Sequence, residues 1–100
     1  MILEQADITI APGKQADFDA AIRHGVETII SKSKGFVGYQ VHKGIESPER
    51  YLLLIRWETL ENHTVDFRES VAFQDWRALV GPFFAKPPVV EHFELAVEHG

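Results

Sequence analysis

The chain has 100 residues, a net charge of −5 and no cysteine. Its hydrophobic share of 45% and charged share of 25% are those of an ordinary globular protein, which excludes disordered, collagen-like and low-complexity classes. An acidic chain without a basic cluster is not expected to bind nucleic acid, and the lack of cysteine excludes disulfides and thiolate metal sites. The longest apolar run, residues 51–55, is too short to cross a membrane, and no leader peptide opens the chain, so we expect a cytoplasmic protein.

The first third of the chain predicts a strand followed by a helix. Residues 1–10 alternate loosely between apolar and polar side chains and end at Pro12-Gly13, which is typical of a strand and a turn. From residue 15 to about residue 33 the apolar residues recur at helical spacing, and Gly35 is placed to end that helix. Gly25 lies on the apolar stripe, where glycine costs about 1 kcal/mol relative to alanine. We therefore expect it to allow a close approach to the sheet or to leave room for a ligand.

Two strands are predicted next, over residues 36–43 and 50–57, with a turn between them that makes a hairpin. Thr59 is placed to cap a short helix over residues 60–67.

The last third predicts a second helix and a final strand. Ser70 is placed to cap a helix over residues 71–80, which Gly81 ends, and residues 89–97 predict the last strand. The order β-α-β-β-α-α-β predicts an α+β, ferredoxin-like fold in which a four-stranded antiparallel sheet carries its helices on one face. The absence of a linker or repeat predicts a single domain over residues 1–100.

The predicted sheet has apolar residues on both faces. On the third strand Tyr51, Leu53, Ile55 and Trp57 point one way, and Leu52 and Leu54 point the other. On the second strand, alternation assigns Phe36 and Gly38 to one face and Val37, Tyr39 and Val41 to the opposite face. The helices of one chain suffice to cover one face only, so we expect a homodimer that packs through the sheet face.

Several segments together resemble a known family. They are the glycine-rich segment 35–39, the end of the third strand at 55–58, His63 in the helix that follows, and residues 73–76 and 90–93. In these features the chain resembles the antibiotic biosynthesis monooxygenase superfamily, over essentially its whole length. The resemblance implies a dimeric α+β barrel.

Two branches of that superfamily make different demands on the sequence. The haem-degrading branch uses an Asn on the first strand and a Trp and a His on the later helices, and none of the three has a match here. The branch that oxidises anthrone-like phenols without metal or flavin is more similar. Its Trp corresponds to Trp57 and its Arg to Arg77, while His63 stands where that branch has a proton-relaying Tyr. Leu53 stands where that branch has an Asn that binds the substrate carbonyl, so the chain departs from the branch at this position.

These residue types suit oxygenation without a cofactor, in which a phenol loses a proton and the resulting anion is protected from water. His63 is a candidate for proton transfer because its ordinary pKa is near neutrality. Arg77 is a candidate for stabilising an anion, and Trp57 for a flat wall of the site. Each has a structural alternative. His63 would be a polar residue near a helix start, Arg77 would form an ion pair, and Trp57 would pack in the core. The other candidates for binding an aromatic substrate are Tyr39, Phe67, Phe73, Trp76 and Phe83.

No metal site is expected, because the five histidines show no metal-binding spacing. One alternative is that His42 and His92 meet if their strands are neighbours.

The sequence thus favours a homodimeric, cofactor-independent monooxygenase acting on a hydroquinone or an anthrone-like phenol. Two other functions stay open. One is a non-catalytic dimer that binds a small apolar ligand, and the other is a non-redox isomerase or lyase with His63 as its base.

Overall fold

The computed structural model describes residues 1–100 and contains one four-stranded sheet. Its strands are β1 (Ile2–Thr9), β2 (Phe36–Lys43), β3 (Arg50–Trp57) and β4 (Val89–Glu94). They lie in the order β2-β3-β1-β4, and every neighbouring pair is antiparallel. The expected α+β, ferredoxin-like fold is confirmed.

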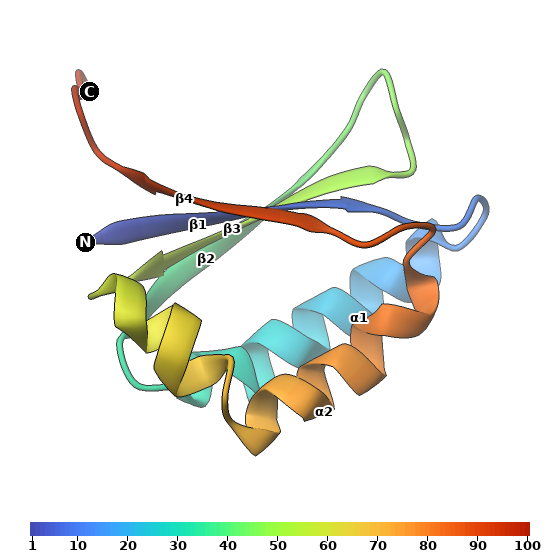
Figure 1. Cartoon of the computed structure of the whole chain (residues 1–100). Helices are drawn as coiled ribbons and strands as arrows, with labels where there is room; N and C mark the ends of the chain where they lie inside the picture. The colour runs from blue at the N-terminus through green and yellow to red at the C-terminus, as the bar shows by residue number, and fades with distance from the viewer.

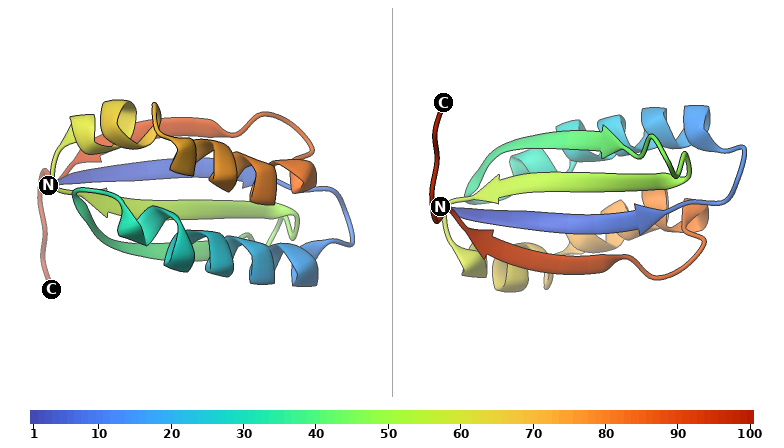
Figure 2. Two further views of the ribbon diagram at one scale, coloured as in Figure 1. Left: turned by 90° about the horizontal axis from the view of Figure 1, so that it is seen from below. Right: turned by 90° about the horizontal axis from the view of Figure 1, so that it is seen from above.

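The helices all lie on one side of the sheet (Figure 1). The two longer ones, α1 (Gln15–Thr28) and α2 (Val71–Val80), run side by side across it, and the opposite face of the sheet carries no helix (Figure 2). Three short helical turns complete the structure: η1 (Ile30–Lys32), η2 (Asn62–Phe67) and η3 (Gly81–Phe83). No helix combines the length and the hydropathy that a membrane span requires.

The core lies between the sheet and the helices, and strand alternation explains its composition. On β3 every second residue is buried, from Tyr51 to Trp57, as the sequence predicts. On β1 the buried residues alternate in the same way from Glu4 to Ile8. The apolar stripe predicted for the first helix is buried against them through Phe18, Ile22, Gly25 and Val26.

The side chains of β2 do not alternate strictly between the two faces of the sheet, in contrast to what the sequence suggested. The register with β3 shifts between Phe36 and Gly38, so the strand carries a bulge there. Because of this extra residue, Phe36 and Tyr39 both pack against the core, while Val37 is exposed. Strict alternation groups Phe36 with Gly38 and Val37 with Tyr39 and Val41. That grouping is wrong, because the bulge shifts the alternation by one residue and places Phe36 on the same face as Tyr39 and Val41.

Three elements also end or wind differently from the prediction. The first helix ends at Thr28 and continues as the tighter turn η1, rather than reaching residue 33. The segment predicted as a short α-helix is the π-helical turn η2. β4 ends at Glu94, opposite Ile2 of β1, rather than at residue 97. The spacing of side chains alone does not distinguish an α-helix from a 3₁₀ or π turn, and it does not locate the last residue of an element.

Gly25 is explained by the contact between the two long helices. A Cβ atom built on Gly25 would lie 2.7 Å from the ring of Trp76 on α2. The glycine therefore lets α1 approach α2, rather than the sheet.

Candidate functional site

A cavity of about 570 Å³ lies between the sheet and the helical layer. This volume is within the range of roughly 300–1,000 Å³ typical of small-molecule sites. Its walls are mainly apolar and come from β1, β3, η1, η2 and α2; they include Ile8, Ile30, Leu53, Phe67, Phe73 and Trp76. The polar groups deep in the cavity are Glu4 and His63, which are 5% and 3% exposed.

The turn η2 positions His63. Thr59 and Asn62 cap its start reciprocally: the Thr59 backbone N–H donates to Asn62 Oδ1 at 3.0 Å, and the Asn62 N–H donates to Thr59 Oγ1 at 3.2 Å. The Arg68 N–H then donates to the carbonyl oxygen of His63, five residues back, which widens the turn. As a result His63 and Phe67 are both buried with their rings stacked at 6.2 Å between centroids.

Glu4, His63 and His92 form a chain of close polar contacts, in which His63 and His92 are hydrogen-bonded and His63 and Glu4 are within ion-pair distance. His63 Nδ1 lies 2.8 Å from His92 Nε2, and His63 Nε2 lies 3.4 Å from Glu4 Oε1. The indole of Trp57 donates to the same Glu4 oxygen at 2.9 Å and stacks on the His63 ring at 5.4 Å between centroids. His92 belongs to the edge strand β4, directly opposite Glu4 in the register, and is partly exposed.

Burial changes the proton affinity of this chain. It raises the pKa of Glu4 to about 7, against the opposing effects of the Trp57 hydrogen bond and the charge of Arg68. It lowers the pKa of His63 to about 4, helped by the charge of Arg68 and by His92, and it also lowers the pKa of His92. At neutral pH His63 is therefore neutral, while Glu4 is close to half protonated.

A neutral imidazole between two partners permits two hydrogen-bond arrangements. With Glu4 ionised, His92 Nε2–H donates to His63 Nδ1, and the proton on His63 Nε2 faces the carboxylate. With Glu4 protonated, His63 Nδ1–H donates to His92, and the unprotonated His63 Nε2 faces the carboxyl group. The arrangement therefore suits transfer of a proton between Glu4 and His92 through a neutral His63 ring.

The structure brings five of the predicted site residues to the cavity and leaves three outside it. His63, Phe67, Phe73, Trp76 and Arg77 line the cavity. Trp57 does not line the cavity, because its ring stacks on His63 and its indole N–H donates to Glu4.

Tyr39 and Phe83 lie elsewhere in the fold. The Tyr39 hydroxyl donates to Glu27 on α1 at 3.2 Å, and the Phe83 ring packs edge-on against Phe18 at 5.6 Å. His42 and His92 do not meet, because β2 and β4 are the two opposite edges of the sheet. Nowhere in the chain do three or more histidine or acidic side chains gather in a way that would hold a metal ion.

Sequence reasoning missed Glu4, although a signal was present. Glu4 is in phase with Ala6 and Ile8 on the buried face of β1, so it interrupts an apolar alternation with a carboxylate. A charged residue at an inward position is rarely buried unless it has partners. His92 carries a similar signal, because it is in phase with Val90, but only the register places it opposite Glu4.

The fold and this cavity define a small ferredoxin-like protein with an acid–base chain at the floor of an apolar pocket. The family model described as antibiotic biosynthesis monooxygenase matches residues 1–79. The chain belongs to this family and is a monooxygenase-like protein.

Individual relatives agree over nearly the whole chain. The protein YczJ of Bacillus subtilis (strain 168) is 42% identical over 94 residues, covering 94% of this chain and 98% of its own. A crystal structure from Bordetella bronchiseptica, of a protein assigned to the antibiotic biosynthesis monooxygenases, is 44% identical with a TM-score of 0.90, covering 96% and 97% of the two chains. A Nitrosomonas europaea structure with the same assignment is similar in fold alone, at 18% identity and a TM-score of 0.80, covering 99% and 93%.

Proposed function

We propose that this protein is a cofactor-independent monooxygenase that oxidises a small aromatic substrate, a hydroquinone or an anthrone-like phenol, with molecular oxygen. The observation that carries the proposal is the Glu4–His63–His92 chain, which ends inside an apolar cavity. Such a site can remove a proton from an aromatic substrate and protect the resulting anion from water.

The chemistry balances without an external reductant. At an anthrone-like CH₂ group, loss of one proton leaves a carbanion that reduces O₂ and forms a C–O bond. The peroxide anion takes up that proton. Loss of the second C–H proton then breaks the O–O bond, which leaves a carbonyl group on the substrate and releases water. The substrate supplies all four electrons, so the protein needs to supply proton transfer and charge stabilisation only.

Each role matches a group in the cavity. Glu4 accepts the substrate proton, because its pKa of about 7 lets it serve as a base near neutral pH. His63 returns the proton or passes it to His92. Arg77 stabilises the anionic intermediates, since a guanidinium stays charged at all relevant pH values. Trp57 acts as a positioning residue that holds both Glu4 and His63 through its hydrogen bond and ring stacking.

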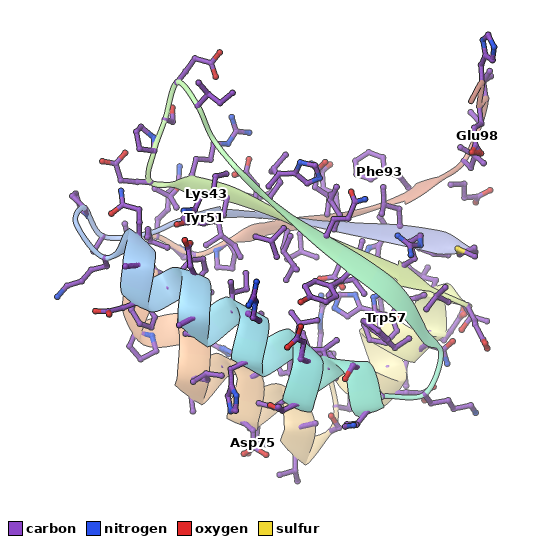
Figure 3. The ribbon with its side chains drawn as sticks, turned by 180° about the vertical axis from the view of Figure 1, so that it is seen from behind. Lys43, Tyr51, Trp57, Asp75, Phe93 and Glu98 are labelled. Carbon is purple, nitrogen blue, oxygen red and sulfur yellow. The ribbon has the colours of Figure 1, made fainter.

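We also propose that two chains associate through the face of the sheet that carries no helix. That face presents Leu3, Leu52 and Leu54 from the two central strands, with Gln5 and Glu91 beside them, and the exposed side chains of Val89 and Phe93. Figure 3 shows Phe93 on the side of the sheet away from the helices. The segment after β4 continues away from the sheet with Leu95 and Val97 exposed (Figure 1). Exposed apolar surface of this kind marks an interface in many proteins.

The test is oxygen consumption by the purified protein with anthrone and a panel of substituted hydroquinones. We expect uptake by the wild type, and a decrease of kcat of about 100-fold in Glu4→Gln and in His63→Gln, which is the usual range for loss of an acid–base group. His24→Gln and Glu46→Gln are the matched controls, because both residues are exposed and lie outside the cavity. Both controls are expected to keep the wild-type rate.

The outcomes separate the open alternatives. Absence of oxygen uptake over the whole panel would contradict the oxygenase, and consumption of a substrate without oxygen would indicate an isomerase or lyase. If either variant does not fold, the wild-type pH profile replaces it: kcat should rise with pH through about 7 as Glu4 ionises. A rate that is flat through that range would contradict the role of Glu4.

A further inference from the structure

Three cationic side chains line the cavity: Arg68, Arg77 and Lys86. None of them forms an ion pair, since the ion pairs of this chain are Lys43–Asp19, Arg50–Asp7 and the His63–Glu4 contact. The only acidic residue among the cavity walls is Glu4. The chain as a whole carries a net charge of −5, so its composition does not account for this concentration of positive charge.

The three cations lie on the exposed side of the cavity wall, which is its mouth. All three are exposed, whereas Glu4 and His63 are buried. They come from separate segments of the chain: the end of η2, the helix α2 and the stretch that leads into β4. Side chains from separate elements therefore converge on one opening.

Both arginines act on groups that line the cavity. The Arg77 guanidinium lies 5.9 Å from the centroid of the Phe73 ring, which is itself a cavity wall. The charge of Arg68 lowers the pKa of Glu4 at the cavity floor. Lys86 also lowers the pKa of Asp7, which is outside the cavity, so Lys86 interacts with groups on both sides of the wall.

Cations around an apolar opening repel one another, and an anion placed between them removes that repulsion. Guanidinium groups suit this task, because they bind carboxylates and phosphates through two parallel hydrogen bonds. We propose that the substrate is an amphipathic aromatic anion, whose flat ring lies against the apolar floor and whose carboxylate or similar group binds Arg68 and Arg77 at the mouth. This inference rests on the proposed function only in directing the reacting ring toward Glu4.

Binding of two fluorescent probes with the same ring system tests the proposal without turnover. The probes are anthracene-9-carboxylate and its neutral counterpart 9-anthracenemethanol, each titrated against the purified protein. We expect the carboxylate to bind at least about tenfold more tightly, as a charge-assisted hydrogen bond provides. Arg68→Gln and Arg77→Gln should each remove most of that preference while leaving the affinity for the alcohol unchanged. Arg23→Gln, an exposed arginine on α1 outside the cavity, is the matched control and should keep the preference.

Equal affinity for the two probes would overturn the proposal, as would a preference that Arg23→Gln lowers as much as the cavity variants do. These outcomes are distinguishable from failure of the oxygenase. A retained preference for the carboxylate without oxygen uptake supports the anion site alone. Oxygen uptake with neutral phenols, combined with equal probe affinities, contradicts the anion site and leaves the oxygenase standing.

Discussion

Glu4 places a carboxyl group on the apolar face of β1, where the neighbouring inward residue is Ala6. Its partners come from three other elements: Trp57 from β3, His63 from η2, and His92 from β4 through His63. Burial raises the pKa of the Glu4 carboxyl and lowers that of the His63 imidazole. The two groups therefore do not form an ion pair, and both are uncharged when Glu4 is protonated. A neutral pair avoids the cost of burying two charges.

The raised pKa of Glu4 has a defined effect on stability. Between the unfolded pKa of 4.5 and the folded pKa of about 7, the folded state keeps a proton that the unfolded state has lost. This contribution to the free energy of unfolding is complete below pH 4.5 and is lost as the pH rises to about 7. His63 acts in the opposite direction, because its folded pKa of about 4 is below its unfolded value of 6.5.

Glu4→Gln isolates the carboxyl contribution. We expect the free energy of unfolding of the variant, relative to the wild type, to rise by about 3 kcal/mol between pH 4.5 and pH 7. Urea unfolding at several pH values measures this difference. Glu46→Gln, which changes an exposed carboxylate, should give a curve parallel to that of the wild type. Parallel curves for Glu4→Gln would show that Glu4 has an ordinary pKa.

At the scale of elements, the contact between α1 and α2 sets one wall of the cavity. Trp76 packs against Gly25 on one side and lines the cavity on the other. The cap predicted at Ser70 is present, because its Oγ accepts from the Phe73 N–H at 3.3 Å, and it fixes the start of α2. Local capping and close helix packing together hold the Trp76 ring in place.

Gly25→Ala tests this packing. Alanine favours a helix by about 1 kcal/mol, but its Cβ would lie 2.7 Å from the Trp76 ring, so we expect a net loss of about 1–3 kcal/mol in the free energy of unfolding. Ala20→Gly is the matched control, because Ala20 is an exposed residue of the same helix and its replacement changes helix propensity without a close contact. It should lower the free energy of unfolding by about 1 kcal/mol. A stabilised Gly25→Ala protein would contradict the close approach of the helices.

In the whole molecule, the helices cover one face of the sheet and leave the other face open (Figure 2). The helices bury Leu53 and Ile55 of β3, whereas Leu52 and Leu54 of the same strand remain on the open face. The ion pair between Asp7 and Arg50 lies toward one end of the sheet. The open face mixes these leucines with Gln5 and Glu91, and such a mixture is compatible with an interface because interfaces as a whole are about as apolar as the rest of a protein surface.

Leu54→Glu tests the proposed dimer. We expect the wild type to sediment with about twice the mass of one 11.3 kDa chain, and Leu54→Glu to sediment as a monomer, because a carboxylate would be buried without a partner in the interface. Leu60→Glu, at an exposed site beside η2, should remain dimeric. A wild type that sediments as a monomer would contradict the interface.

A site residue could be predicted where the direction of its side chain is set by residues close to it in the sequence, and could not where that direction is set by distant ones. The aromatic walls Phe67, Phe73 and Trp76 were predictable, because helical spacing places them on one side of their elements. Tyr39 and Phe83 were predicted as binding residues but lie outside the cavity. Their direction depends on the β2 bulge and on packing against α1, which no short-range pattern contains.

Local patterns along the chain were enough to predict the order of the elements, the cap at Ser70 and the apolar residues of the core. These features follow from turn chemistry and from periodicities of 2 and 3.6 residues, which are local properties of the chain. The meeting of Glu4, His63 and His92 is a property of the folded protein alone, because strand register and the widened turn η2 bring together residues far apart in the sequence. Their proton affinities were decided there too, since a pKa depends on burial and on through-space neighbours.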